Sequence, residues 1–284
     1  GDTVLLVSGG WGYLIDEARA LGLDTIVVPT LGNTFNPIKI LHTFLGLRKI
    51  ARNFSPEIIS IHSSFAGFIG RLALGRKYPT IFTAHGIAFT KGAPVWRKPI
   101  AILAELVASR FCKKIIAVSE NDRGMILKYL SLPKEKVVTI YNGVRATESV
   151  DFSSKRKDIV FVGRLFPPKT PEVLIEALNI LKNKKYDVPN LVIIGEGDKR
   201  KILEDKIKAY SLEKNVHLMG ECSQEVTRKT LADSSVFVLP TLWEGFPMTI
   251  LEAMSEGCVV VASDVGGISE AVTSDTGIVL PRGV

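Results

Sequence analysis

Short runs of apolar residues, many of them β-branched, recur along the chain and alternate with segments in which apolar residues return every three or four positions. A near-continuous apolar run is typical of a strand buried on both faces of a sheet, and the intervening pattern is typical of a helix with one buried face. This alternation predicts parallel sheets covered by helices on both sides. The predicted strands are residues 3–8, 25–29, 57–62, 80–85, 114–119, 136–142, 158–163, 190–195, 215–220, 235–240, 258–263 and 277–281.

A polar segment interrupts the alternation between the sixth and seventh predicted strands. Residues 143–158, GVRATESVDFSSKRKD, are rich in serine and charge and poor in apolar residues, which is typical of a linker. We therefore expect an α/β fold of two doubly wound, Rossmann-like lobes, residues 1–146 and residues 147–284. The default binding site of such a chain is the cleft across which the two lobes face each other.

Charge is distributed unevenly over these two halves. The chain of 284 residues has a formal net charge of +7, yet residues 1–146 carry an excess of basic residues and residues 147–284 a slight excess of acidic ones. Basic residues in segments 97–99 and 112–114 flank the apolar stretch 100–111. This pattern fits a helix lying on an anionic membrane, and it also fits a packed domain helix with solvated ends. The basic residues are not interleaved with aromatic ones, so a nucleic-acid partner is not expected.

Other features of the composition limit the location and the chemistry. Cys112, Cys222 and Cys258 are far apart in apolar surroundings, which predicts buried thiols in a reducing compartment and neither a disulfide nor a metal site. No uncharged apolar run reaches the length of a membrane span, and the first residues contain no basic leader. We expect a cytoplasmic protein, either soluble or attached to the inner face of the cell membrane.

One pair of cations follows the seventh predicted strand. Gly163 and Arg164 stand where that strand ends, and Lys169 precedes a helix predicted to begin near Pro171. Ligands of doubly wound sheets bind outside the carboxyl ends of the strands, where an Arg and a Lys could clamp a diphosphate. Two solvated loop cations are an equally good interpretation. The nearby Gly195-Glu196-Gly197 lacks the third glycine of a dinucleotide fingerprint, which disfavours a nicotinamide cofactor.

The segment WEGFPMTILEAM, residues 243–254, places two carboxylates eight positions apart. A helix that begins at Pro247 leaves the first amide N–H groups free at a positive dipole end, which predicts an anion site. Glu244 precedes this helix and Glu252 lies within it. Carboxylates beside an anion site suit paired hydroxyls, such as those of ribose or a sugar, better than they suit phosphate. The alternative is a loop acid at Glu244 and a solvated helix acid at Glu252.

The same segment resembles the acid-seven-acid motif of the retaining glycosyltransferases of family 4, which have the two-lobed GT-B fold. The resemblance extends over most of the chain, through stretches such as VGRLFPPK, IIGEGDKRKILEDKI and GCVVVASDVGGISEAV in the second half and FTAHGIAF in the first. Members of this family usually have a further strand ahead of residues 3–8 and further helices after residues 277–281. By this resemblance we expect the chain to be a fragment that lacks these elements, and an inactive fragment is the alternative to an active enzyme.

The resemblance implies roles for individual residues. Glu252 would hold the ribose hydroxyls, Glu244 would contact the donor sugar, and Arg164 and Lys169 would hold the diphosphate and stabilise the departing nucleotide. His85 matches a histidine that approaches the donor sugar, with a packed or turn histidine as the alternative for it and for His62. The remaining donor-binding residues would be Gly163, Leu218, Gly220, Gly245, Phe246, Pro247, Met248 and Thr249.

The resemblance also implies a reaction. The donor would be a UDP-sugar or a GDP-sugar, the acceptor a lipid-linked or growing polysaccharide, and no metal or other cofactor would be needed. Two other functions stay open: a nucleotide-sugar epimerase of the same architecture, and a nucleotide-binding module without catalysis. An epimerase would need more histidines and carboxylates around the sugar than a chain with four histidines offers.

Overall fold

The computed structural model describes residues 2–32, 34, 36–87, 89, 96, 98–145 and 156–281, and for Tyr13, Arg156 and Lys157 it describes the backbone only. The chain forms two compact units. The first takes Gly1–Phe89, Ala93–Val118 and Arg123–Ile140, and the second takes Thr90–Gly92, Ser119–Asp122 and Tyr141–Val284. The predicted boundary after residue 146 and most of the predicted linker lie outside the described residues.

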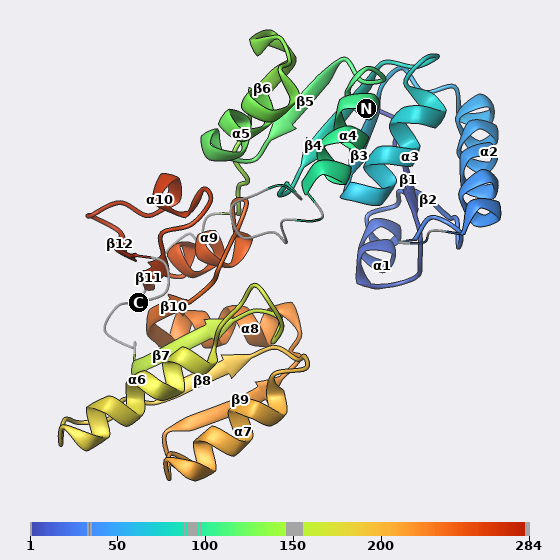
Figure 1. Ribbon diagram of the computed structural model, residues 1–284. Coiled ribbons are helices and arrows are strands. Elements are labelled where there is room, and N and C mark those ends of the chain that lie inside the picture. The colour runs from blue at the N-terminus through green and yellow to red at the C-terminus, as the bar shows by residue number, and fades with distance from the viewer. Residues whose placement is uncertain are drawn as a thin grey trace. The chain divides into compact units, whose positions relative to one another are not determined.

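The described strands of the first unit form two parallel sheets (Figure 1). One sheet pairs β1 (Leu5–Ser8) with β2 (Asp24–Val27). The other contains, in spatial order, β3 (Ile59–His62), β4 (Thr80–Ala84), β5 (Lys114–Ala117) and β6 (Val137–Thr139). The helices are α1 (Tyr13–Ala20), α2 (Pro37–Phe54), α3 (Ser64–Leu74), α4 (Lys98–Ser109), α5 (Glu120–Leu130) and the 3-10 turn η2 (Lys134–Lys136). Residues 120–122 at the start of α5 belong to the second unit.

Local signals in the sequence set both ends of α2. The side chain of Asn36 accepts hydrogen bonds from the backbone N–H groups of Ile38 and Lys39, and Pro37 fills the first turn, where no N–H is needed. The helix ends at Ser55, whose φ of 52° is left-handed. Its buried face, which includes Leu47, packs against α3.

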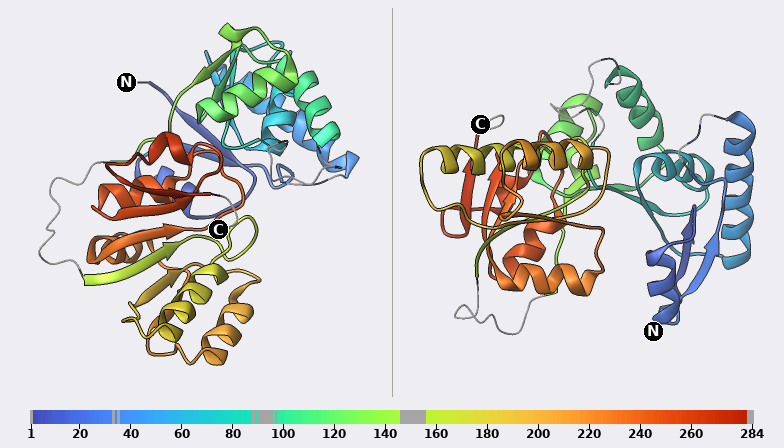
Figure 2. Two further views of the ribbon diagram at one scale, coloured as in Figure 1. Left: turned by 60° about the vertical axis from the view of Figure 1, so that its left-hand side comes forward. Right: turned by 90° about the horizontal axis from the view of Figure 1, so that it is seen from below.

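The second unit contains one parallel sheet of six strands in the order β12-β11-β10-β7-β8-β9. The strands are β7 (Arg156–Val162), β8 (Leu191–Ile194), β9 (Val216–Gly220), β10 (Ser234–Leu239), β11 (Val259–Ser263) and β12 (Gly277–Leu280). The helices are α6 (Glu172–Asn183), α7 (Arg200–Ala209), α8 (Gln224–Asp233), α9 (Met248–Ser255) and α10 (Ile268–Ala271). Helices cover both faces of this sheet (Figure 2).

The core of the second unit lies between its sheet and its helices. Phe161 of β7, Ile193 of β8 and Phe237 of β10 are fully buried and belong to one apolar cluster with residues of α6, α7 and α9. All four residues of β8 are buried, as a strand covered on both faces must be. The near-continuous apolar run of β8 therefore marks a strand covered on both faces, whereas the similar run of β12 forms an edge strand with alternating burial.

The α/β fold and all twelve predicted strands are confirmed. The second unit is a doubly wound sheet of the expected kind. The first unit carries its described strands in two sheets, a division that the apolar pattern does not reveal because the pattern of a strand is the same whichever neighbour it pairs with.

Candidate active site

The strand order of the second unit reverses between β7 and β10. Chain connections run outward from β7 through β8 to β9 and, on the other side, from β10 through β11 to β12. The carboxyl ends of β7 and β10 therefore flank the switch point, where ligands bind in open α/β sheets. The loop after β7 contains Gly163, Arg164 and Lys169, and the loop after β10 leads to Glu244.

Backbone hydrogen bonds join these two loops. Leu242 N–H donates to the carbonyl of Pro168 at 3.0 Å, and Thr170 N–H donates to the carbonyl of Pro240 at 3.0 Å. Lys169 and Thr241 form an isolated antiparallel bridge. The loops are thus held side by side by their own main chains, and their side chains converge.

Lys169 and Glu244 form an ion pair at this junction. Both side chains are largely buried, with relative exposures of 15% and 14%. The hydroxyl of Thr241 donates to the same carboxylate oxygen of Glu244 at 2.9 Å. Lys199 also holds the loop after β7, because its ammonium donates to the backbone carbonyl of Lys169 at 2.8 Å. The sequence analysis treated Lys169 and Glu244 as separate candidate binding residues, and in the structure their side chains are in contact.

The start of α9 supplies free backbone donors, with one correction to the sequence analysis. Pro247 is not the first helical residue but the N-cap, in extended conformation, and α9 begins at Met248. No side chain caps this end. The N–H of Ile250 donates to the carbonyl of Pro247 at 3.3 Å, so it is not one of the free donors. The N–H groups of Met248 and Thr249 are the ones that suit an anion.

Glu252 lies in the second turn of α9 and is half-buried. Its partial burial raises the pKa of the carboxyl above the ordinary value. Among the described residues its carboxylate has no ion-pair or hydrogen-bond partner. A carboxylate that is partly desolvated without a partner is poised to accept hydrogen bonds from a ligand, which makes a solvated helix acid a poor description of Glu252.

Glycines of another loop lie against the backbone between the two acids. Gly267 N–H donates to the carbonyl of Gly245 at 2.8 Å, and a Cβ on Gly266 would lie 1.9 Å from the carbonyl oxygen of Glu244. The φ of Gly266 is +60°, which also favours glycine. Asn142 donates its side-chain N–H to the carbonyl of Phe246 at 2.9 Å. This segment of the site is therefore held in place by residues far away in the sequence.

Two predicted donor-binding residues lie apart from this group. Leu218 and Gly220 belong to β9, which is separated from β7 by β8. The side chain of Leu218 packs against the core, and Gly220 has a φ of +76° beside the carboxylate of Glu196. The roles of all these residues in donor binding stay predictions.

His85 belongs to the first unit, directly after β4. Its Nε2 lies 2.9 Å from Nδ1 of His62, and Nε2 of His62 lies 3.1 Å from the hydroxyl of Ser60. Both imidazoles are exposed and stacked, with ring centroids 5.2 Å apart. Partial desolvation of the ring, and then the neighbouring His62, lower the pKa of His85 from its ordinary value. Neither histidine is a packed core residue.

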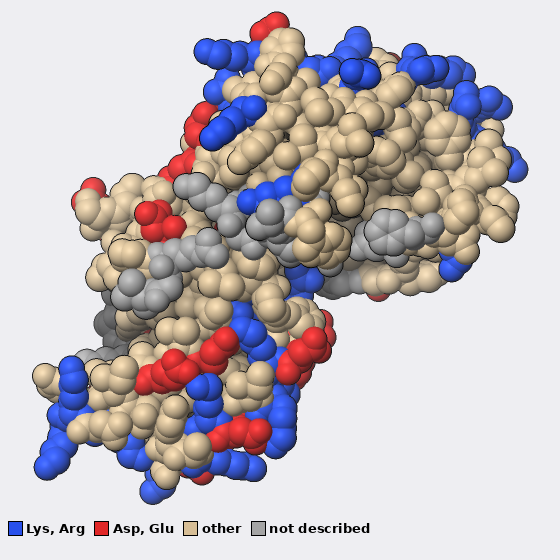
Figure 3. Space-filling model, in the orientation of Figure 1, with Lys and Arg blue, Asp and Glu red and all other residues tan. Residues whose placement is uncertain are grey.

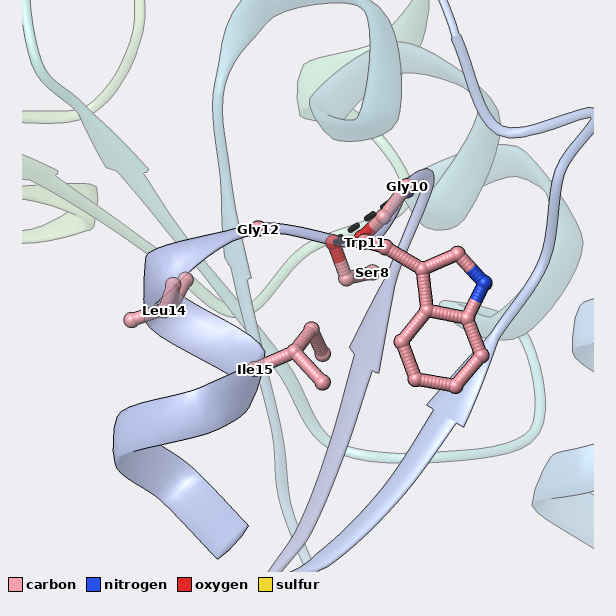
Figure 4. Close-up of a pocket in the computed structure, with 6 residues that line it drawn as sticks. All are labelled: Ser8, Gly10, Trp11, Gly12, Leu14 and Ile15. Atoms are coloured by element: carbon pink, nitrogen blue, oxygen red, sulfur yellow. Dashed lines mark hydrogen bonds between the residues drawn. The ribbon is translucent and has the colours of Figure 1, made fainter. Parts of the chain in front are cut away.

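The first unit also has a shallow hollow at the end of β1, lined by Ser8, Gly10, Trp11, Gly12, Leu14 and Ile15 (Figure 4). The hydroxyl of Ser8 donates to the carbonyl of Gly10 at 3.1 Å. None of the predicted site residues lines this hollow, and the indole of Trp11 is exposed.

The described residues contain no cluster of three or more His, Cys, Asp or Glu arranged to hold a metal.

Charge and apolar exposure coincide on the first unit. On the face drawn in Figure 3 its Lys and Arg outnumber its acids, whereas basic and acidic side chains are mixed over α6 and α7 of the second unit. In α4, Ile100 and Leu103 are 67% and 63% exposed, while Ala108 and Ser109 are buried. The helix is thus packed on one face and apolar on the outward face. Arg97 of the expected basic flank lies outside the described residues. No described helix is long and apolar enough to cross a bilayer.

Comparison with known proteins gives a consistent result. The family model "Glycosyltransferase Family 4" matches residues 1–148, and "Glycosyl transferases group 1" matches residues 145–283. An Escherichia coli protein named UDP-Gal:alpha-D-GlcNAc-diphosphoundecaprenol alpha-1,3-galactosyltransferase is 31% identical over 272 residues, covering 90% of this chain and 68% of its own. The O-antigen biosynthesis glycosyltransferase WbnH of the same organism is 27% identical over 271 residues, covering 95% of this chain and 75% of its own.

A solved structure is similar over almost the whole chain. The structure of Anabaena Alr3699/HepE in complex with UDP-glucose has a TM-score of 0.80 at 21% identity and covers 98% of this chain and 78% of its own. At this identity the similarity concerns the fold, which is GT-B, with two Rossmann-like domains.

Proposed function

The chain belongs to the family 4 glycosyltransferases, and from this premise we propose that it transfers a hexose, with retention of anomeric configuration, from a UDP-sugar to an acceptor carried on a lipid diphosphate. The observation that carries the proposal is the largely buried ion pair of Lys169 and Glu244 at the switch point of the second unit, in the loop that leads to the uncapped start of α9. The choice of UDP and of a lipid diphosphate follows the E. coli galactosyltransferase, whose name specifies both. A GDP-sugar is the alternative donor.

In the proposed complex the diphosphate lies between the Arg164 and Lys169 side chains and the amides of Met248 and Thr249. The two cations and the helix dipole stabilise the negative charge that grows on the leaving nucleotide. This arrangement needs no metal ion for charge neutralisation, and none is part of the proposal. Glu252 accepts hydrogen bonds from both ribose hydroxyls, which replace the water that its half-buried carboxylate has partly lost.

The ion pair between Lys169 and Glu244 has a consequence for donor binding. When the diphosphate takes over the ammonium of Lys169, Glu244 loses its cationic partner and becomes free to accept hydrogen bonds from hydroxyls of the donor sugar. A nucleoside diphosphate without a sugar leaves that carboxylate without the hydroxyls. The arrangement therefore couples diphosphate binding to sugar binding within one unit.

For the acceptor, we propose that the outward apolar residues of α4 and the basic residues of the first unit lie against the anionic inner face of the cell membrane. Each Lys or Arg near such a surface contributes about 1 kcal/mol, so several would hold the protein reversibly without a membrane span. Replacing Ile100 and Leu103 with Gln should weaken sedimentation with phosphatidylglycerol vesicles and leave donor hydrolysis unchanged. Binding that is equal for both proteins would contradict the membrane proposal alone.

A panel of UDP- and GDP-sugars tests the function. The protein is incubated with each sugar nucleotide and with N-acetylglucosaminyl-diphosphoundecaprenol, and products are analysed by mass spectrometry. We expect one donor to add a single hexose to the acceptor. Epimerised donor without acceptor would identify an epimerase, and nucleoside diphosphate binding without any turnover would identify a binding module.

A further inference from the structure

Thr241 is a buried residue at the switch point, bonded to the carboxylate of Glu244. It is 2% exposed and lies in the loop after β10, two residues beyond the end of the strand. Its hydroxyl donates to Oε1 of Glu244 at 2.9 Å, and its backbone N–H donates to the hydroxyl of Ser263 on β11 at 3.1 Å. Its main chain also bridges Lys169. Thr241 is thus fixed from three sides.

The hydroxyl of Thr241 has one hydrogen and two acceptors in reach. The carbonyl of Trp243 lies at 3.4 Å, and the carboxylate of Glu244 lies at 2.9 Å. A hydrogen bond to an ionised acceptor is about twice as strong as one to a neutral acceptor. The hydrogen therefore goes to Glu244, and the carbonyl is at most a weak second partner.

The two groups that hold Glu244 differ in stiffness. Lys169 reaches the carboxylate through a flexible four-carbon stem, and in the proposed complex its ammonium turns to the diphosphate. Threonine is β-branched with a restricted χ1 angle, and here it is buried. Thr241 is therefore the partner that stays in place when the ion pair opens.

We propose that Thr241 is a positioning residue, which holds one oxygen of Glu244 so that the other faces the hydroxyls of the donor sugar. The inference rests on the proposed function of Glu244 as the sugar contact. Its consequence is specific: Thr241 affects the recognition of a sugar attached to the nucleotide, and it leaves the recognition of the nucleoside diphosphate itself unchanged.

Two variants of the full chain separate this role from a structural one. Thr241→Val removes the hydroxyl and keeps the shape of the side chain, and Thr241→Ser keeps the hydroxyl. We expect Thr241→Val to lower kcat/KM for the UDP-sugar by about tenfold to a hundredfold, the range for losing one hydrogen bond to a charged group. Affinity for UDP, measured by calorimetry, should stay within about twofold of the wild type by the same argument. Thr241→Ser should restore most of the activity.

A matched control and a second readout complete the test. Thr230→Val removes a hydroxyl that donates to the carbonyl of Val226 on α8, and we expect no change in turnover. The ¹³C chemical shift of the Glu244 carboxylate, assigned with Glu244→Gln, should move in Thr241→Val and not in Thr241→Ser, whether or not the enzyme turns over. An unmoved signal in Thr241→Val, or an equal loss of UDP and UDP-sugar affinity, would overturn the inference. A moved signal in a protein that binds no sugar nucleotide would instead contradict the proposed function.

Discussion

The two units hold their candidate site residues in different ways. In the second unit Lys169, Glu244 and Thr241 are largely buried, bonded to one another and carried by loops that share backbone hydrogen bonds. In the first unit His62 and His85 are exposed and joined by a single contact between their rings. Interactions in a desolvated site are stronger than the same interactions in water. We therefore expect substitutions in the second unit to have the larger effects.

The largest effect is expected for Glu252→Gln. The amide keeps the size of the side chain and removes the charge that would accept two ribose hydroxyls, each worth about 1.5–3 kcal/mol as a hydrogen bond to a charged group. Affinity for UDP should fall at least about a hundredfold by calorimetry. Glu204→Gln, which alters a partly exposed acid of α7 that pairs with Arg200, should leave UDP affinity unchanged. Equal affinities for all three proteins would remove Glu252 from the site.

The next effect is expected for Lys169→Met. Methionine keeps the stem and removes the ammonium, so the leaving diphosphate loses one stabilising charge and Glu244 loses its ion-pair partner. We expect kcat to fall about 10²–10³-fold, as for other groups that stabilise charge in a transition state. Lys206→Met, which breaks the ion pair with Glu176, serves as the control. A change in KM alone would assign Lys169 to ground-state binding.

A smaller effect is expected for His62→Gln, because the histidine pair is exposed. The loss of one solvated contact should lower kcat/KM by about twofold to tenfold. The pH profile carries more information than the rate. His62 is one cause of the lowered pKa of His85, so its removal should raise that pKa and move the acidic limb of the profile to higher pH. An unmoved limb would show that His85 does not control the profile.

The smallest effect on activity is expected for Asp122→Asn, which should act on stability alone. Asp122 is fully buried, and burial raises the pKa of its carboxyl from 3.8 to about 7. Because the folded-state pKa is raised, the wild type is most stable below about pH 3.8, where the group is neutral in both states, and it loses stability as the pH rises from 3.8 to about 7. The variant should melt at a higher temperature than the wild type at pH 8, and the difference should be smaller at pH 5. A difference that is larger at pH 5 would contradict this sign.

Most of the architecture could be predicted from the sequence. Continuous apolar runs such as that of β8 identify strands of a parallel sheet without any knowledge of their neighbours. The order of the strands could not be predicted from the sequence, because strand pairing depends on contacts between distant segments. For the same reason the sequence did not predict that the strands of the first unit form two sheets.

The site was predicted residue by residue and not as an arrangement. Lys169 and Glu244 stood out as charged residues at strand ends, yet nothing in their spacing indicates that they form an ion pair. Thr241 carried no signal, since a threonine after a strand is ordinary, and its importance comes from what it contacts. His62 and His85 are the last residues of two predicted strands that follow one another in the chain. Because such consecutive strands often pair in parallel, their ends could have been predicted to lie side by side, which would have brought the two histidines together.

Calorimetric titration of the wild-type chain with UDP and with the UDP-sugar that the donor panel selects tests the central claim most directly. If the switch point of the second unit binds both parts of the donor, both ligands bind, the sugar nucleotide binds more tightly than UDP, and Glu244→Gln removes only that difference. Binding of neither ligand, or a preference for the sugar nucleotide that survives in Glu244→Gln, would contradict the account.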